Sequence, residues 1–205
     1  MNEFDIKAAD WDKNPMHWDR SEAIVQEIRK RIPLTRNMTA MEYGAGTGIA
    51  SFLLSDNLKE ITLMDNSSEM VRIMKEKIES SGVNNLKALN IDLEHNDYKA
   101  GKFDFIFTQM VLHHVADTGA IINKFSGLLN SGGFLAIADL YTEDGSFHGE
   151  GFIGHNGFDP ESFSGILSNN HFTNITHNPC FVIERKISEN ETKEYQVFLL
   201  TATRA

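Results

Sequence analysis

The sequence predicts an α/β fold in which a doubly wound parallel sheet carries helices on both faces. Two observations predict it. Short apolar segments alternate with helical patterns between residues 39 and 140, and a glycine-rich turn joins the first segment to the helix that follows. Such alternation builds parallel strands connected by helices. A length of 205 residues suits a single domain.

The elements are expected in a regular order. Apolar positions at helical spacing predict a packing helix over 19–31, which Pro33 ends. Strands are expected over five apolar segments: 39–43, 61–65, 86–91, 103–108 and 134–139. Helices are expected between them, over 47–57, 67–81 and 117–129. A long loop at 141–158 is followed by a helix over 160–168 and by strands at 172–185 and 194–204, joined by a polar turn at 188–191.

Local caps support two of these helices. Ser67 or Ser68 can cap the helix at 67–81, and Gly82 ends it. Asp159 can cap the helix at 160–168, whose first residue is Pro160.

The glycine-rich turn indicates a nucleotide-like ligand. Gly44, Gly46 and Gly48 follow the strand at 39–43 and let a ligand approach the backbone closely. The dinucleotide fingerprint needs its third glycine at position 49, which is Ile49, and the lysine of a phosphate-binding P-loop is absent from the turn. Glu42 would repel a pyrophosphate but suits a ligand with positive charge. An ordinary loop is the alternative for glycines alone.

Polar side chains at the ends of later strands strengthen this interpretation. Asp65 ends the second strand about 20 residues after the first glycine, the spacing that brings an acid to ribose hydroxyls. Asp92 ends the third strand, and Gln109 follows the fourth. Ligands bind at these strand ends in parallel α/β sheets.

Together these motifs resemble the class I S-adenosylmethionine-dependent methyltransferases, in their small-molecule, ubiquinone-biosynthesis-like branch (methyltransferase type 11). The resemblance covers residues 17–140. Its motifs are the acid and glycine turn at 42–48, Asp65, the pair Asp92-Leu93, the strand at 103–108, and the segment 129–133, where Ser131 replaces the family's proline.

The resemblance implies a Rossmann-like seven-stranded sheet with an antiparallel last strand, S-adenosylmethionine as cofactor, S-adenosylhomocysteine as product and a small-molecule acceptor. It divides one domain into an N-terminal flap and packing helix (1–33), a cofactor-binding core (39–140), a substrate-side loop (141–158) and a helix with a closing hairpin (159–205). The cofactor-binding residues that it implies are Glu42, Gly44, Ala45, Gly46, Gly48, Asp65, Asn66, Met70, Asp92, Leu93, Gln109 and Trp11.

Composition limits the partners. A net charge of −10 argues against nucleic acid, whose phosphates need a basic surface. The single Cys180 argues against internal disulfides and multi-cysteine zinc sites and favours a reducing, cytoplasmic location. Neither a signal peptide nor an apolar run long enough to span a membrane is expected. The oligomeric state stays open.

The N-terminal segment carries Trp11, Asp12 and Trp18 around Pro15, which interrupts any helix there. In the family that the chain resembles, this region is a mobile flap with an aromatic-Asp pair near the sulfonium, a place that Trp11-Asp12 would take. The alternative is that the tryptophans only dock the segment on the sheet.

Histidines and aromatics mark the expected acceptor side. The substrate pocket is predicted to contain His113, His114, Tyr141, His148 and His155. Methyl transfer needs mainly alignment, and a base only when the acceptor must lose a proton. The candidate bases are His114, His148 and His155. Buried structural histidines and a loop that only fills a side pocket are the alternatives. The histidines show no recognised metal-ligand spacing, so no metal is expected, although metal binding by the loop stays open.

The alternative function is a non-catalytic S-adenosylmethionine-binding or regulatory module, because a fold does not determine an activity. Ile49 disfavours a nicotinamide oxidoreductase. The segment 108–111 lacks the Asn/Asp-Pro-Pro-aromatic run of base and amide methyltransferases and the acids of catechol-type magnesium enzymes.

Overall fold

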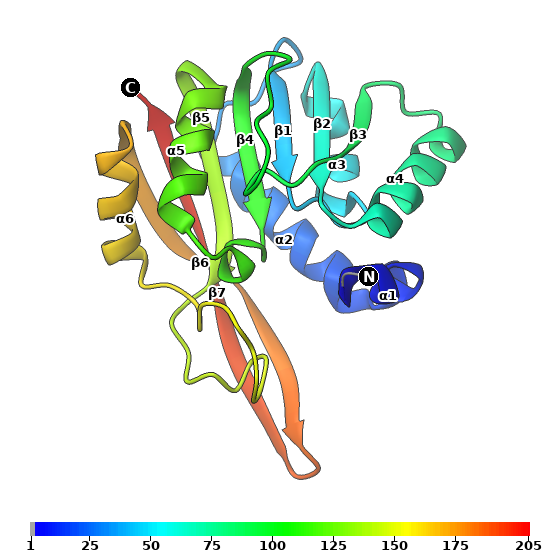
Figure 1. Cartoon of the computed structure of the whole chain (residues 1–205), viewed down its shortest axis with the longest axis vertical. Helices are drawn as coiled ribbons and strands as arrows, with labels where there is room; N and C mark the ends of the chain where they lie inside the picture. Colours follow the sequence, from blue (N-terminus) through cyan, green and yellow to red (C-terminus); the bar gives the residue numbers. More distant parts are fainter. Residues whose placement is uncertain (1–2) are drawn as a thin grey trace.

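The computed structural model describes residues 3–205 and contains a seven-stranded sheet of order β3-β2-β1-β4-β5-β7-β6 (Figure 1). The strands are β1 Thr39–Tyr43, β2 Glu60–Asp65, β3 Leu86–Asn90, β4 Phe103–Gln109, β5 Leu129–Leu140, β6 Phe172–Ser188 and β7 Glu191–Arg204. Strands β1 to β5 pair in parallel, and β7 is antiparallel to both β5 and β6. The predicted mostly parallel sheet with an antiparallel last strand is confirmed.

Helices cover both faces of this sheet, as predicted. They are α1 Glu3–Lys7, α2 Pro15–Arg31, α3 Ile49–Leu54, α4 Ser68–Ser81, α5 Thr118–Leu128 and α6 Pro160–Asn169, with short 3-10 segments η1 Ala8–Lys13, η2 Ser55–Asn57 and η3 Leu112–His114. Apolar side chains of α2, α3 and α4 build the core on one face, and those of α5 and α6 build it on the other. None of the helices within residues 3–205 is both long and apolar enough to cross a membrane.

The predicted caps form. The Ser67 hydroxyl accepts a hydrogen bond from the backbone N–H of Met70 at 3.2 Å, and Gly82 ends α4 with a φ of 72°. At α6, the Asp159 carboxylate accepts from the backbone N–H of Ser162 at 3.1 Å. These caps satisfy backbone groups that a helix end leaves without intrahelical partners.

The helix predicted over 19–31 starts earlier than expected. It begins at Pro15, because Asn14 caps it with a side-chain oxygen that accepts from the backbone N–H of Met16 at 3.1 Å. Proline is well suited to the first helical turn, where its missing N–H would have no partner in any case. Pro15 therefore starts a helix instead of interrupting one.

The last two strands are longer than predicted and leave only residues 189–190 as the turn. Figure 1 shows the β6–β7 hairpin projecting beyond the rest of the sheet with the 141–158 segment beside it. The Ser146 hydroxyl and the Tyr195 hydroxyl are 2.6 Å apart, and Lys193 pairs with Asp144. β5 also begins early, at Leu129, so the segment 129–133 lies within a strand whose pairing with β4 is irregular.

Candidate functional site

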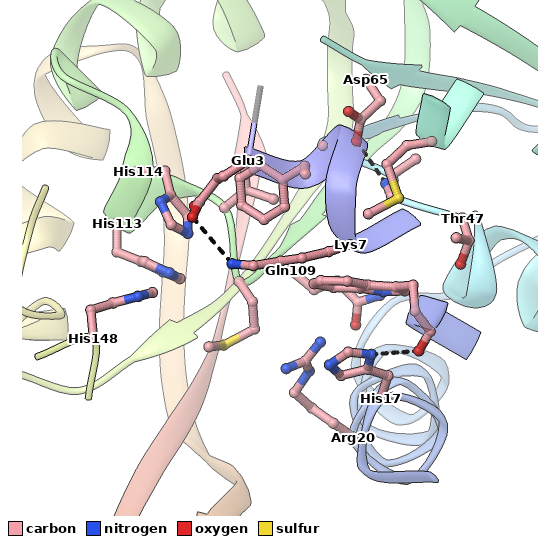
Figure 2. A pocket seen from close by; sticks show the side chains of 18 of the residues that line it. Glu3, Lys7, His17, Arg20, Thr47, Asp65, Gln109, His113, His114 and His148 are labelled. Carbon is pink, nitrogen blue, oxygen red and sulfur yellow. Dashed lines mark hydrogen bonds and ion pairs between the residues drawn. The ribbon is translucent and has the colours of Figure 1, made fainter. Parts of the chain in front are cut away.

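A cavity of about 1330 Å³ opens at the carboxyl ends of β1, β2 and β4. The glycine turn and Asp65 border one part of it, and His113, His114 and His148 border another. The N-terminal segment from α1 to α2 also lines it, as does part of β6. Figure 2 shows the labelled side chains of these segments turned toward a common space.

The glycine turn leaves room for a ligand against its backbone. Gly44 has a φ of 67°, and a Cβ there would come within 2.4 Å of Val111 Cγ2. Gly46 has a φ of 58°, and the nearest atom to a Cβ built there is Trp11 Nε1 at 3.8 Å. Gly44 therefore permits close packing of β1 against the segment after β4, whereas Gly46 exposes its backbone to the cavity.

Asp65 is held at the cavity wall by backbone hydrogen bonds. Its carboxylate accepts from the backbone N–H of Gly46 at 2.7 Å and from that of Ser67 at 2.8 Å. Burial raises the pKa of Asp65, and the two backbone donors oppose that effect. These bonds orient the carboxylate beside the turn and connect β1 to the start of α4.

Glu42 lies beneath the turn, outside the lining of the cavity. Its side chain is fully buried, and one carboxylate oxygen accepts from the Ser51 hydroxyl. The other oxygen, Oε1, has no hydrogen-bond partner among residues 3–205. Burial raises the pKa of Glu42 to about 8, so the carboxyl is largely protonated at neutral pH in this state.

Arg20 is a site residue that the sequence reasoning missed. It lines the cavity from α2 with only 7% of its surface exposed. Its Nη1 donates a weak hydrogen bond to the sulfur of Met16 at 3.8 Å, and its Nε has no hydrogen-bond partner within the described chain. Burial lowers the pKa of Arg20 to about 10, opposed by Asp139. Spacing could have found it, because Arg20 precedes Ile24 and Ile28 at intervals of four on the buried face of α2.

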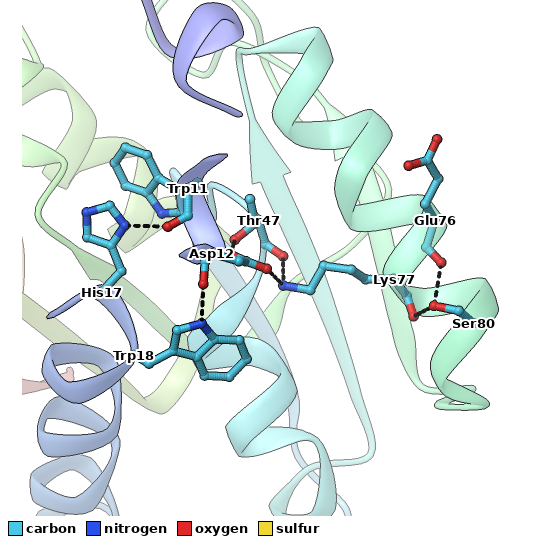
Figure 3. A network of polar contacts seen from close by, with 8 residues as sticks. All are labelled: Trp11, Asp12, His17, Trp18, Thr47, Glu76, Lys77 and Ser80. Atoms are coloured by element: carbon cyan, nitrogen blue, oxygen red, sulfur yellow. Dashed lines mark hydrogen bonds and ion pairs between the residues drawn. The ribbon is translucent and has the colours of Figure 1, made fainter. Parts of the chain in front are cut away.

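The N-terminal segment is clamped over the glycine turn (Figure 3). Lys77 Nζ on α4 donates to the Asp12 carboxylate at 2.6 Å and to the Thr47 carbonyl at 2.9 Å. The Thr47 hydroxyl also donates to Asp12. Trp11 stacks on His17 with ring centroids 4.1 Å apart. This clamp holds Trp11 against the cavity, and Lys77 is a second residue that sequence reasoning missed.

Trp18 behaves differently from Trp11. It is 38% exposed, and its indole N–H donates to the Asp12 carbonyl at 3.0 Å. The two tryptophans therefore have different surroundings: Trp11 lines the cavity, whereas Trp18 is partly exposed to solvent.

The histidine part of the cavity contains a buried hydrogen-bonded pair. His113 Nδ1 lies 2.6 Å from Asp139 Oδ1, and both side chains are almost completely buried. Burial, reinforced by the neighbouring His113, lowers the pKa values of His114 and His148 to about 4. Both rings are therefore neutral at pH 7 and can act as acceptors or ligands.

The structure brings most of the predicted site residues to this cavity. Those that line it are Trp11, Gly44, Ala45, Gly46, Asp65, Asn66, Met70, Asp92, Gln109, His113, His114 and His148. Those that lie outside its lining are Glu42, Gly48, Leu93, Tyr141 and His155.

Local packing accounts for the residues outside the lining. Gly48 precedes α3 and packs toward Leu63, and Leu93 is fully buried in the core. Tyr141 packs edge-on against Phe198, and His155 Nε2 lies 3.0 Å from the Val115 carbonyl. The structure thus separates His155 from His114 and His148, the other candidate bases.

A family model described as "Methyltransferase domain" matches residues 34–191, which is most of the chain. The chain belongs to this methyltransferase family. The class predicted from the sequence, the class I S-adenosylmethionine-dependent methyltransferases, is confirmed by that match and by the fold.

Curated relatives of this methyltransferase share part of its length. An uncharacterized methyltransferase of Schizosaccharomyces pombe is 29% identical over 153 residues, which are 67% of this chain and 54% of the relative. A phosphatidylethanolamine N-methyltransferase of Cereibacter sphaeroides is 26% identical over 110 residues, 53% of this chain and 54% of that protein. The methyltransferase chain thus spans about half the length of these relatives.

Solved structures agree on the fold. Phosphoethanolamine N-methyltransferase 2 of Haemonchus contortus, in complex with S-adenosylmethionine, aligns with a TM-score of 0.71 at 14% identity, covering 91% of this chain and 52% of the other. The N-methyltransferase NodS of Bradyrhizobium japonicum, in complex with S-adenosylhomocysteine, aligns with a TM-score of 0.69 at 17% identity, covering 94% of this chain and 89% of the other.

Proposed function

We propose that this protein binds S-adenosylmethionine and transfers its methyl group to a small-molecule acceptor. One observation carries the proposal: a single cavity joins the glycine turn and Asp65 to the cluster of His113, His114 and His148. Its volume of about 1330 Å³ exceeds the roughly 300 to 1,000 Å³ of an ordinary small-ligand pocket. The cavity therefore has room for a cofactor and an acceptor side by side.

The residues present fit the cofactor. Asp65 would accept hydrogen bonds from the ribose hydroxyls, and the exposed backbone of Gly46 leaves space for the ligand beside it. Arg20 is a buried cation with weak protein contacts, which suits the carboxylate of the methionine moiety. Trp11 would cover the ligand from the clamped N-terminal segment.

When bound, the cofactor supplies an activated methyl group on a sulfonium. The protein then has to align the acceptor and exclude water, and alignment alone contributes roughly 7 to 11 kcal/mol in favourable cases. His114 and His148 face the cavity with neutral rings, so either can accept a hydrogen bond from the hydroxyl or thiol of an acceptor and orient it. The relatives named above support a small-molecule acceptor, and the net charge of −10 disfavours nucleic acid. The single Cys180 supports a cytoplasmic location.

Ligand selectivity tests the cofactor assignment. Calorimetry should show saturable binding of S-adenosylmethionine and S-adenosylhomocysteine and none of NAD or NADP; the opposite preference would refute the proposal. Arg20→Gln should weaken S-adenosylhomocysteine about 10- to 150-fold, from about 1.5 to 3 kcal/mol for a charged hydrogen bond. It should leave 5′-methylthioadenosine, which lacks the carboxylate, unchanged. Equal losses for both ligands would remove Arg20 from the carboxylate.

Turnover tests the enzyme against the non-catalytic alternative. Release of S-adenosylhomocysteine can be followed with a panel of small amines, hydroxyl compounds and thiols. A panel member that accelerates release and gains one methyl group in mass would establish methyl transfer. Tight cofactor binding without turnover across all three acceptor classes would favour the non-catalytic alternative.

A further inference from the structure

Three histidines converge on one point of the cavity wall. His113 and His114 lie at the end of η3, and His148 comes from the 141–158 segment. Each offers one nitrogen, and the three nitrogens lie within 4.8 Å of one another. Figure 2 shows the three rings side by side at the edge of the cavity.

His113 is oriented for this role by a buried carboxylate. Its Nδ1 lies 2.6 Å from Asp139 Oδ1, so a neutral ring carries its proton on Nδ1 and leaves the lone pair of Nε2 available. Asp139 is itself held in place, because it also accepts from the backbone N–H of Leu140 at 2.8 Å. A carboxylate behind a histidine is the usual arrangement around protein-bound metal ions.

His148 has a nitrogen that the rest of the described chain leaves unsatisfied. Its Nε2 is buried and makes no hydrogen bond to residues 3–205, while its ring stacks on Phe152 with centroids 3.9 Å apart. A buried polar atom without a partner costs about 1 to 3 kcal/mol, so native structures rarely keep one without a ligand or water.

We propose that His113, His114 and His148 bind a divalent transition-metal ion, with zinc as the best match, in the acceptor part of the cavity. Three neutral imidazoles with an open fourth position are a typical catalytic zinc set. Zinc–nitrogen bonds of about 2.0 to 2.1 Å require the rings to move closer together. Gly145, Gly149 and Gly151 flank His148 with positive φ and allow such an adjustment.

The ion's role rests on the proposed function. Its open position would face the acceptor and bind a hydroxyl or thiol, whose proton passes to water. The remaining lone pair then forms the bond to the methyl carbon as the carbon–sulfur bond of the sulfonium breaks. The segments involved also explain why sequence spacing shows no metal motif, since His148 lies 34 residues after His114.

Metal titration of the full chain tests the site without any acceptor. After treatment with a chelator, the protein should bind one equivalent of Co²⁺ with the visible absorption of a tetrahedral site, and Zn²⁺ should displace it. His148→Ala should weaken Zn²⁺ binding at least about tenfold. His155→Ala is the matched control, because it removes a histidine of the same segment that lies outside the cluster. Circular dichroism confirms that both variants are folded.

Three results would overturn the site: no stoichiometric metal binding, equal affinity in wild type and His148→Ala, or an equal loss in His155→Ala. Asp139→Asn gives a second readout and should weaken Zn²⁺ about 10- to 100-fold with His148 intact. Measuring the affinity for S-adenosylhomocysteine on the same samples tests the proposed function independently of the metal site. Metal binding without cofactor binding would refute the proposed function and leave the site standing, and the reverse result would refute only the site.

Discussion

Replacing Glu42 with glutamine should change how the stability of the ligand-free protein depends on pH. Glu42 is fully buried beneath the glycine turn, with one oxygen bonded to the Ser51 hydroxyl. Glutamine has nearly the same shape, can still accept from Ser51 and carries no ionisable proton. The substitution therefore isolates the cost of ionising a carboxyl in this position.

Burial raises the pKa of Glu42 from 4.5 to about 8, so the folded state binds a proton that the unfolded state releases above pH 4.5. A carboxyl with a raised pKa contributes less to the free energy of unfolding as pH increases, and this decrease ends once the pH passes the pKa of the folded state. Each pH unit in this window corresponds to 1.36 kcal/mol. Between pH 5 and pH 8 the wild type should lose about 3.5 kcal/mol relative to Glu42→Gln, because the folded carboxyl is already half ionised at pH 8.

Urea unfolding of both proteins at pH 5, 6.5 and 8 measures this difference, because all other titrating groups cancel in the comparison. Glu79→Gln, which changes an exposed glutamate on α4, is the control and should follow the wild-type curve. A difference between Glu42→Gln and wild type that stays constant from pH 5 to pH 8 would show that Glu42 ionises normally and would refute the reasoning.

Two substitutions and one deletion test the glycine turn, Asp65 and the N-terminal segment. Asp65→Ala should weaken S-adenosylhomocysteine about 10- to 150-fold in calorimetry, from about 1.5 to 3 kcal/mol of charged hydrogen bonding, and a change below about twofold would separate Asp65 from the ribose. Deleting residues 1–13 should leave α2 folded but reduce the affinity for S-adenosylhomocysteine, because Trp11 is lost from the cavity. If the deletion leaves this affinity unchanged, and if the tryptophan fluorescence of the full chain does not change when the ligand binds, the segment serves only in packing. Gly44→Ala should cost about 2 to 5 kcal/mol of unfolding free energy, because it adds a clash to left-handed strain. Gly82→Ala, with a similar φ and open space around it, should lose only the strain, and equal losses in both would contradict the packing argument.

The elements that sequence predicted correctly depend on neighbouring residues. Ser67 caps α4 through a residue three positions on, and Asp159 does the same for α6. The early start of α2 also depends on neighbouring residues, since Asn14 before Pro15 is a pattern typical of a helix start. It differs from the prediction because proline is equally typical of a helix break. The early start of β5 and the extra length of the hairpin depend on partner strands, which no local pattern reports.

The residues of the site show the same distinction between local patterns and long-range contacts. Asp65 could be predicted because a βαβ unit brings the end of its second strand to the glycine turn at a set spacing. Lys77 could not, because it reaches Asp12 across 65 residues of sequence, and its helix position alone indicates only a solvated charge. Tyr141 and His155 have the composition of pocket residues, but the path of the 141–158 segment turns them toward Phe198 and Val115.

The sequence alone determined the family, the sheet with its helices on both faces, and the glycine turn and Asp65 that border one part of the cavity. Each of these is encoded in strand, turn and helix patterns of a few consecutive residues whose backbone preferences act locally. Only the tertiary structure decided that Arg20 is buried at the wall of the cavity and that His148 joins His113 and His114. Those contacts bring together segments far apart in the chain, and their burial, which sets the pKa values and leaves polar atoms without partners, exists only once the layers have packed.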